Sequence, residues 1–507
     1  MLFRNYKRKE NAMKRLIAAT AIIAAFAAQA KVKLAAPFAD GMVFQREMPV
    51  RVWGTADAGE KVKVVFGDAS VDAVADASGK WLVELPAMRA CKTGRTLAVN
   101  DIRVSDVLVG EVWMCAGQSN TDCPVWGQSP RYRDAWGSMM LMTTDRPLVR
   151  LVKTPKAMAL EPKLDVKVEW MKMTPSLWDA WKAGKAMPSA MGYYFALELA
   201  NALDIPIGLV DSSWGGTNVD TWTPRSGYKG LSGLDVERDW KMVPQQEWKP
   251  SMVTGPINAA HKQTSALWNG MVAVYTPMSV RGFIWYQGCS NSREPERYAN
   301  KMQALYNGWA AEFRNPDLSL YFVQLAPWGF KEIALIQEAQ AKFAAQEKNA
   351  AMAVINDVGN LYDIHPSDKR TVAKRLSLHA LKRNYGWKNV QNESPTLKGW
   401  KIEGSKFILS FNDADGFYVY NVDRSLTTGF EVCGADGVWK PAKIVNFKPT
   451  VRNGKKVYHG TVDGKDLVVE ADGVAAPKKL RYLYSAPWFG SLYAESGLPV
   501  GAFHIGD

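Results

Sequence analysis

The middle of the chain alternates short, continuous apolar runs with stretches of helical periodicity. The runs have the length and composition of fully buried strands, and they cover residues 108–115, 148–152, 207–212, 281–286, 320–325 and 351–356. Apolar side chains also recur with helical spacing over residues 298–313, 336–347 and 372–380, which is typical of helices with one buried face. Strands that alternate with helices predict a parallel sheet and an α/β fold.

Both flanks of this region have the shorter, alternating pattern of β structure. In residues 31–104, Val62 and Val64 alternate with lysines, and turn sequences such as Ser78-Gly79 separate the runs. Beyond residue 387, short apolar runs return at 407–411, 417–420, 430–432, 466–470 and 481–484. We therefore predict three domains in the 507-residue chain: an N-terminal β-sandwich module (31–104), an α/β domain (105–386) and a C-terminal β domain (387–507).

The first thirty residues have the pattern of a secretory signal. Lys14 and Arg15 form a basic segment, residues 16–28 are apolar, and Ala28-Gln29-Ala30 fits a cleavage site. The apolar stretch is shorter than the roughly 20 residues of a membrane-spanning helix. We expect a signal peptide over residues 1–30, cleavage after Ala30, and a periplasmic or secreted mature protein. No second long apolar run follows, so we expect no membrane span in the mature chain.

Composition narrows the classes of partner and cofactor. The chain has 63 Lys and Arg against 50 Asp and Glu, but the basic residues form no block, which argues against a nucleic-acid partner. Its five cysteines are scattered and include no Cys-x-x-Cys pair, which argues against a structural metal and a disulfide scaffold. The sequence carries no indication of the oligomeric state.

A serine follows the first strand of the predicted parallel sheet, in Gly117-Gln118-Ser119-Asn120. Parallel sheets bind ligands beyond the carboxyl ends of their strands. A serine placed there, next to a helix N-terminus, suits attack on a carbonyl group and stabilisation of the resulting oxyanion. The alternative is that Ser119 simply caps the following helix.

A nucleophilic serine needs a general base, and the chain has five histidines. His365 alone among them follows a predicted strand of the α/β domain, so it is the predicted base. Asp357 and Asp363 are candidates to orient its ring. Asp363 is the closer in sequence, but side chains two residues apart point in opposite directions in an extended segment.

Two other strand ends carry hydrogen-bond donors. Residues 213–217 contain the pair Gly215-Gly216, whose N–H groups are unhindered, and residues 285–291 contain amide side chains. Either segment is a candidate oxyanion hole, although each is also ordinary turn sequence. Complementary groups at four independent strand ends favour catalysis over chance.

In order and spacing, these segments resemble the motifs of the sialate O-acetylesterase family, a branch of the SGNH hydrolases. The matching segments are Val109-Gly110-Glu111-Val112-Trp113, Gly117-Gln118-Ser119-Asn120, Ser213-Trp214-Gly215-Gly216-Thr217, Trp285-Tyr286-Gln287-Gly288 with Ser290-Asn291, and Asp363-Ile364-His365-Pro366 with Lys369; residues 42–46 and 52–54 extend the likeness into the leading β module. The resemblance implies a flavodoxin-like SGNH hydrolase core with a parallel sheet, flanked by N-terminal and C-terminal β-sandwich-like domains. It also implies removal of O-acetyl groups from sugars without a metal or organic cofactor.

The resemblance assigns roles to individual positions. Ser119 looks like the nucleophile, His365 like the base and Asp363 like the acid of the catalytic triad. The expected oxyanion donors are the Ser119 N–H, Gly216 and Gln287, and the expected substrate contacts are Asn120, Trp214 and Asn291. The wider superfamily usually places the acid three residues before the histidine, where this chain has Tyr362, so a backbone carbonyl is an alternative partner for the imidazole.

The chain departs from the family pattern in two motifs. The family commonly has Met-Glu-Met-Pro after the Ser-Asn pair, where this chain has Thr121, Asp122, Cys123 and Pro124, and it has a glutamate where this chain has Cys289. Loss of that carboxylate is expected to change loop positioning, activity or specificity. Two thiols in two motif loops also raise the hypothesis of a Cys123–Cys289 disulfide.

The sequence thus predicts an exported carbohydrate O-acetylesterase that uses a serine acyl-enzyme mechanism, with acetylated sialic acid as the expected substrate. Two alternatives stay open. The first is an esterase acting on acetylated xylan or another polysaccharide, because the motifs report acyl transfer and not the sugar. The second is a carbohydrate-binding protein with an impaired catalytic site, suggested by Cys289.

Overall fold

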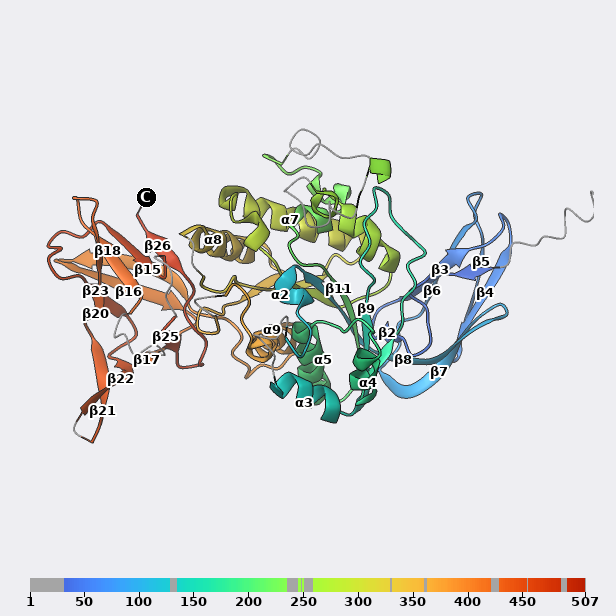
Figure 1. Cartoon of the computed structure of the whole chain (residues 1–507), viewed down its shortest axis with the longest axis horizontal. Helices are drawn as coiled ribbons and strands as arrows, with labels where there is room; N and C mark the ends of the chain where they lie inside the picture. Colours follow the sequence, from blue (N-terminus) through green and yellow to red (C-terminus); the bar gives the residue numbers. More distant parts are fainter. Residues whose placement is uncertain are drawn as a thin grey trace, which may run out of the picture.

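The computed structural model describes residues 32–127, 135–234, 245–247, 249, 259–328, 331–359, 363–420, 428–453, 455–484 and 490–506. The expected signal peptide therefore lies outside the described residues. Figure 1 shows an α/β region in the middle of the molecule, with β strands of the N-terminal part at one end and β strands of the C-terminal part at the other. The protein is thus a mixed α/β structure with additional β-rich parts, as the alternating patterns predicted.

The central sheet has the strand order β10-β9-β11-β8-β12-β13-β14. Its strands are β8 (Ile102–Gly117), β9 (Arg146–Lys153), β10 (Met171–Met173), β11 (Ile207–Ser213), β12 (Gly282–Tyr286), β13 (Ser319–Val323) and β14 (Ala350–Ala353). Neighbouring strands run parallel, except that β10 is antiparallel to β9. Each of the six apolar runs contributes one of these strands, and β11, β12 and β13 are buried over their whole length.

Helices cover both faces of the central sheet. Figure 1 shows α7 (Pro295–Glu312) and α8 (Lys331–Gln346) on one face, and α5 (Ala190–Leu203) and α9 (Lys369–Arg383) on the other. The remaining helical segments are α2 (Ser119–Asp122), α3 (Ala135–Thr143), α4 (Ser176–Lys182), the 3-10 turns η2 (Asp220–Trp222), η3 (Arg225–Tyr228), η4 (Gln245–Glu247), η6 (Ala260–Lys262), η8 (Ala273–Tyr275) and η9 (Cys289–Asn291), and the π-helical turn η7 (Trp268–Val272). On α7, Tyr298, Met302, Leu305 and Trp309 are fully buried, as their spacing predicted.

The N-terminal β strands join the central sheet through one long strand. They are β1 (Lys33–Leu34), β2 (Val43–Gln45), β3 (Val50–Thr55), β4 (Lys61–Phe66), β5 (Ala69–Val74), β6 (Lys80–Leu85) and β7 (Cys91–Val99). β1, β3 and β6 form a three-stranded sheet, whereas β4 pairs with β5 and β7, and β7 pairs with β8. β8 then continues into the central sheet, so the backbone passes from one part to the other without a break.

The C-terminal strands form three antiparallel sheets of four strands, ordered β15-β16-β23-β20, β21-β22-β17-β25 and β19-β18-β24-β26. Their bounds are β15 (Thr396–Glu403), β16 (Lys406–Asn412), β17 (Phe417–Tyr420), β18 (Phe430–Cys433), β19 (Trp439–Pro441), β20 (Lys443–Ile444), β21 (Phe447–Arg452), β22 (Lys455–Val462), β23 (Leu467–Glu470), β24 (Lys479–Tyr482), β25 (Leu492–Ala494) and β26 (Phe503–Ile505). Their buried side chains, such as Phe407, Leu409 and Leu480, form a hydrophobic cluster separate from the one that fills the rest of the molecule.

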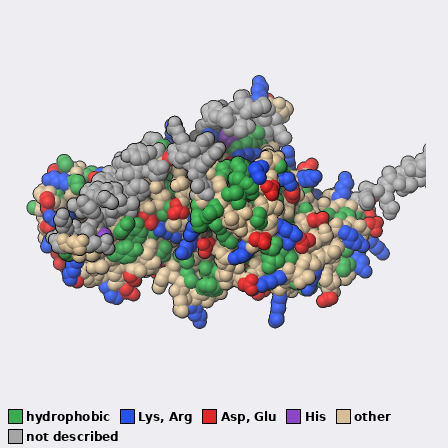
Figure 2. All heavy atoms as spheres, turned by 60° about the horizontal axis from the view of Figure 1, so that its bottom comes forward, with side chains coloured by type: hydrophobic (Ala, Val, Ile, Leu, Met, Phe, Trp, Pro, Cys, Tyr) green, Lys and Arg blue, Asp and Glu red, His purple; other side chains and the backbone are tan. Residues whose placement is uncertain are grey.

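The surface carries charges of both signs. Basic and acidic side chains are interspersed on the face of the molecule shown in Figure 2. Within the described ranges, no helix combines the length and apolar character needed to cross a bilayer.

A buried carboxylate connects the N-terminal strands to the central sheet. Glu111 on β8 is fully buried, and its two carboxylate oxygens accept hydrogen bonds from Arg46 after β2 and from Arg281 before β12. Gln45 donates a further bond of 3.0 Å to the same carboxylate. The segments that carry Arg46, Glu111 and Arg281 are therefore held together by one negative charge. This charge lies near the end of the sheet where β12 begins.

We expect Glu111→Gln to lower the free energy of unfolding by about 3 kcal/mol, because it leaves two guanidinium groups without their carboxylate. The loss lies at the low end for a buried ion pair, since Arg46 and Arg281 each keep 21% of their side-chain surface exposed. Urea unfolding followed by tryptophan fluorescence measures it. The matched control is Glu403→Gln, whose exposed pair with Lys401 is worth less than about 1 kcal/mol. Equal losses in the two variants would contradict the prediction.

Candidate active site

Ser119 lies at the carboxyl end of β8 because the chain turns sharply at Gly117. Gly117 has a φ of 140°, and a Cβ atom there would lie 2.4 Å from the carbonyl oxygen of Tyr286. Only glycine fits this turn without displacing β12. α2 begins directly afterwards at Ser119, so the serine stands at the edge of the sheet and not within it.

Ser119 and His365 meet at this edge, although 246 positions separate them in the sequence. The distance between Ser119 Oγ and His365 Nε2 is 2.9 Å. On the other side of the ring, Nδ1 lies 3.0 Å from Oδ1 of Asp363, and the same oxygen accepts the His365 backbone N–H at 2.8 Å. The three side chains form a continuous hydrogen-bonded row, as a nucleophile, a base and an orienting acid require.

The position of Asp363 corrects one step of the sequence argument. We expected side chains two residues apart to diverge, but residues 363–365 turn instead of running extended, so the carboxylate folds back over its own chain. The rival candidate, Asp357, pairs with Arg375 on α9 through two bonds of 2.6 and 2.7 Å. Tyr362, one residue before Asp363, lies outside the described residues.

The environment of His365 keeps its imidazole neutral. Burial lowers the pKa of His365 from its usual value of 6.5, and the nearby positive charge of Lys369 lowers it further, whereas the carboxylate of Asp363 acts in the opposite direction. The net shift is downward. At neutral pH the ring is therefore able to accept a proton from the serine.

The Gly215-Gly216 turn after β11 lies beside the serine. A Cβ atom on Gly215 would lie 3.4 Å from Cβ of Ser119, and the Gly215 N–H donates to Asp122 Oδ2 at 3.3 Å. Gly216 has a φ of 74°, is exposed and has open space beyond its Cα. The predicted role of Gly216 as an oxyanion donor stays a prediction.

A buried charge cluster, which the sequence analysis missed, fixes the serine helix to the ends of β9 and β11. Lys153 Nζ lies 2.8 Å from Asp122 and 3.0 Å from Asp211. Burial opposes the charge of Lys153, but the two carboxylates outweigh it and raise the lysine pKa, whereas burial raises the pKa of Asp211. The sequence does contain an indication of this cluster, because Lys153 directly follows a predicted buried strand. A buried lysine requires negatively charged or polar partners.

Two predicted contact residues, Gln287 and Asn291, are buried and bonded within the protein. Gln287 is fully buried; its amide donates to Thr217 O and to Asn291 Oδ1, and its oxygen accepts the Tyr298 hydroxyl. Asn291 is 1% exposed and also bonds Val219 N and Glu294. Both amides connect the loops after β11 and β12. The roles expected for Gln287 at the oxyanion and for Asn291 at the substrate stay predictions.

Asn120 likewise joins two loops through its side chain. It is 1% exposed, and its amide donates to Ile364 O at 3.0 Å, in the turn that carries His365. Its side-chain oxygen accepts a bond of 2.7 Å from Lys369 Nζ. The role expected for Asn120 at the substrate stays a prediction.

Trp214 keeps a partly exposed ring beside the site. Its ring centroid lies 5.8 Å from Lys156 Nζ and 5.8 Å from the ring centroid of His261. It directly precedes Gly215, which packs against the serine. A sugar face stacked on this ring would lie within reach of Ser119, so Trp214 remains a predicted substrate contact.

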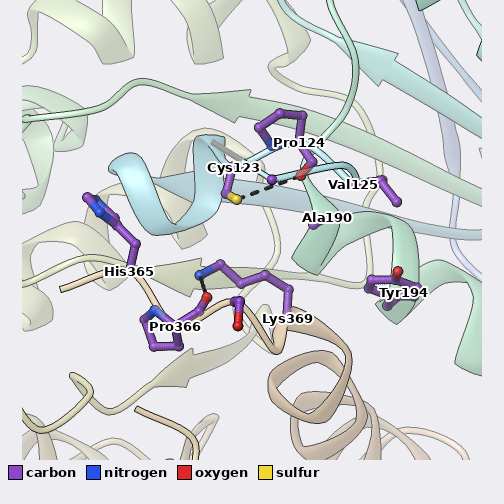
Figure 3. A pocket seen from close by; sticks show the side chains of 10 residues that line it. Cys123, Pro124, Val125, Ala190, Tyr194, His365, Pro366 and Lys369 are labelled. Carbon is purple, nitrogen blue, oxygen red and sulfur yellow. Dashed lines mark hydrogen bonds between the residues drawn. The ribbon is translucent and has the colours of Figure 1, made fainter. Parts of the chain in front are cut away.

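The hypothesis of a Cys123–Cys289 disulfide is wrong, because both residues are present as thiols. Cys123 Sγ instead donates to the carbonyl of its neighbour Pro124 at 3.7 Å (Figure 3). Burial raises the pKa of Cys289 to about 12, so its thiol stays protonated at neutral pH. Cys289 is thus a poor nucleophile in this setting.

A small cavity opens beside His365 (Figure 3). It encloses about 20 Å³ and is lined by residues that include Cys123, Val125, Ala190, Tyr194 and Lys369. This volume holds a water molecule or a methyl group but not a sugar ring. A pyranose would have to lie outside it, on the exposed side of Ser119.

Comparison with known proteins gives one consistent result. Residues 109–373, more than half of the chain, match the family described as carbohydrate esterase, sialic acid-specific acetylesterase. The chain is 30% identical to a sialate O-acetylesterase of Rattus norvegicus, over 80% of this chain and 83% of the relative, and 29% identical to one of Homo sapiens, over 80% of each. The fold is similar to the crystal structure of a carbohydrate acetylesterase from Xanthomonas citri, with a TM-score of 0.76, 28% identity and coverage of 94% of this chain and 99% of that one.

We expect the imidazole of His365 to titrate below pH 6.5, because burial and Lys369 both lower its pKa. Asp363→Asn is expected to lower the pKa further, since the lost carboxylate stabilises the charged ring. NMR of the ring protons measures both values, with His365→Gln used to assign the resonance. A higher pKa in Asp363→Asn would contradict this electrostatic account.

Proposed function

This chain belongs to the sialic acid-specific acetylesterase family of carbohydrate esterases, and from that premise we propose that it removes acetyl esters from sugars through a serine acyl-enzyme. Members of the family are carboxylic ester hydrolases, and this chain is one. The observation that carries the proposed mechanism is the 2.9 Å contact between Ser119 Oγ and His365 Nε2, with Asp363 on the other ring nitrogen.

In the proposed first step, His365 Nε2 takes the proton of Ser119 as the serine oxygen attacks the acetyl carbonyl carbon. Asp363 accepts a hydrogen bond from the Nδ1–H group, without taking its proton, and stabilises the imidazolium that forms. The N–H groups of Ser119 and Gly216 are the proposed donors to the oxyanion. His365 then protonates the departing sugar oxygen, water repeats the sequence on the acetyl-enzyme, and acetate leaves.

We also propose that the core is flavodoxin-like, of the SGNH hydrolase type. The strand order β11-β8-β12-β13-β14 corresponds to the order 2-1-3-4-5, with β9 and β10 added at one edge. Folds of this order bind their ligand where the strand order reverses, beyond the first and third strands. Ser119 follows β8 at that point, next to β12, which supports the assignment.

The proposed substrate is an O-acetylated sialic acid, the compound class in the names of the curated relatives. The structurally similar protein is named more broadly as a carbohydrate acetylesterase. We further propose that the protein is exported and that its signal peptide is cleaved after Ala30. We also propose that the mature chain divides into three domains at residues 104 and 386. The row formed by Ser119, His365 and Asp363 supports a working esterase over an impaired carbohydrate-binding protein.

We expect Ser119→Ala to lower kcat on p-nitrophenyl acetate by about 10³- to 10⁶-fold, because the nucleophile of the covalent step is lost. Ser226→Ala, at an exposed serine that bonds Glu312, is the matched control and keeps full activity. Unchanged turnover in Ser119→Ala would refute the mechanism.

Comparing kcat/KM of the wild-type protein on O-acetylated sialic acid and on acetylated xylan then identifies the substrate. A preference for acetylated xylan would overturn the sialate assignment.

We expect Trp214→Ala to raise KM for an acetylated sugar by about tenfold, because the sugar loses the ring on which it stacks. Its kcat/KM on p-nitrophenyl acetate should change by less than about threefold, because that substrate carries no sugar. Trp214→Phe keeps an aromatic face and serves as the conservative control. Equal losses on both substrates would mean that Trp214 supports the Gly215 turn and does not bind the sugar.

A further inference from the structure

Lys369 lies at the first position of α9, four residues after His365, and is only 2% exposed. Its Nζ donates to Asn120 Oδ1 at 2.7 Å and to the carbonyl oxygen of Pro366. The ammonium group also lies 5.8 Å from the ring centroid of Tyr286 at the end of β12. Figure 3 shows the end of its side chain beside Pro366, with the bond to the Pro366 carbonyl as a dashed line.

These bonds connect the two loops that the proposed reaction must hold together. Asn120 directly follows Ser119, and Pro366 directly follows His365. The amide of Asn120 donates to Ile364 O while its oxygen accepts from Lys369, so both ends of this amide face the histidine turn and its helix. Asn120 and Lys369 are both buried, which strengthens hydrogen bonds between them relative to the same bonds in water.

We propose that Lys369 is a positioning residue of the esterase, whose buried ammonium group holds the serine helix and the histidine turn together through Asn120 and Pro366. The inference rests on the proposed serine mechanism and adds to it the group that keeps nucleophile and base in contact. Lys369 needs no contact with the substrate in this role.

The charge of Lys369 is held mainly by neutral acceptors. None of the ion pairs within 4.0 Å found among the described residues includes it. The titratable groups that face it come from the segments packed around it, and they are Cys123, Tyr286, Cys289, Asp363, His365 and Asp368. Burial raises the pKa values of Tyr286 and Cys289, so both side chains are neutral at pH 7.

Burial therefore lowers the pKa of Lys369 to about 8, although Cys123 and the two aspartates oppose the shift. Above that pH the side chain is a neutral amine, and its two charge-assisted bonds become ordinary ones. Below it, the positive charge lowers the pKa of His365. One lysine thus affects both limbs of the pH profile, which a purely structural residue would not do.

The first test compares Lys369→Met with Lys369→Arg on p-nitrophenyl acetate. We expect Lys369→Met to lower kcat by about 10- to 100-fold with a smaller change in KM, because positioning is lost and substrate binding is not. Its acid limb of kcat/KM should move to higher pH, since His365 no longer faces a positive charge. Lys369→Arg keeps the charge, so its acid limb should stay in place and part of kcat should return.

The second test leaves Lys369 intact and changes its neighbour. We expect the alkaline limb of wild-type kcat/KM to have its midpoint near pH 8. Cys289→Glu adds a carboxylate beside the ammonium group and should move this limb to higher pH, because a negative neighbour raises the pKa of a lysine. Cys289→Gln has the same shape without the charge, and its limb should stay where the wild type has it.

The outcomes separate this inference from the proposed function. Full activity in Ser119→Ala refutes the serine mechanism itself. An inactive Ser119→Ala, combined with wild-type kcat and both pH limbs unchanged in a folded Lys369→Met, overturns the role of Lys369 alone. If circular dichroism shows that Lys369→Met does not fold, the Cys289 pair decides: equal alkaline limbs in Cys289→Glu and Cys289→Gln overturn the proposal, and a limb raised only by Cys289→Glu supports it.

Discussion

A hydrogen bond of 2.9 Å between side chains 246 positions apart depends on the parallel arrangement of the central sheet. Parallel strands bring their carboxyl ends to one edge, so the turns after β8, β11 and β12 are neighbours in space although helices separate them in sequence. Gly117 then allows the chain to leave β8 close to the carbonyl of Tyr286. The contact between Ser119 and His365 is therefore a property of the whole sheet, and neither loop would produce it alone.

Hydrogen bonds between buried polar groups fix the positions of these loops relative to one another. Three sets lie behind the site: Lys153 with Asp122 and Asp211, Gln287 with Asn291, and Asn120 with Lys369. An unpaired buried polar group costs more than a normal hydrogen bond returns, so each set stabilises one arrangement of its loops and penalises the others. The sets also connect segments at the ends of different strands, because Gln287 and Asn291 bond Thr217 O and Val219 N in the loop after β11. The rigidity needed by the serine and the histidine thus comes from buried side chains behind them.

The sequence predicts the parts of this structure that depend on local pattern. Continuous apolar runs identify the six strands, and a serine and a histidine after two of them identify the centre of the site. Side-chain direction is harder, because a motif does not say which side of a loop faces solvent. Gln287 and Asn291 carry the right amides but point into the protein, whereas Asp363 reaches His365 only because its segment turns. The role of Lys369 depends on burial and on a partner 249 positions away, which no local pattern contains.

Burial also links the two titrations that border the working pH range of the site. It lowers the pKa of His365 below 6.5, which extends the neutral, basic form of the ring to more acidic conditions. It lowers the pKa of Lys369 from 10.5 to about 8, which shortens the range on the alkaline side. On the acid side, burial of His365 and the positive charge of Lys369 act together, since the charged lysine disfavours a charged imidazole. A change that let water into this region would move both values towards those of the isolated side chains. The working range would then shift to higher pH as a whole, because its acid and alkaline borders have the same physical cause.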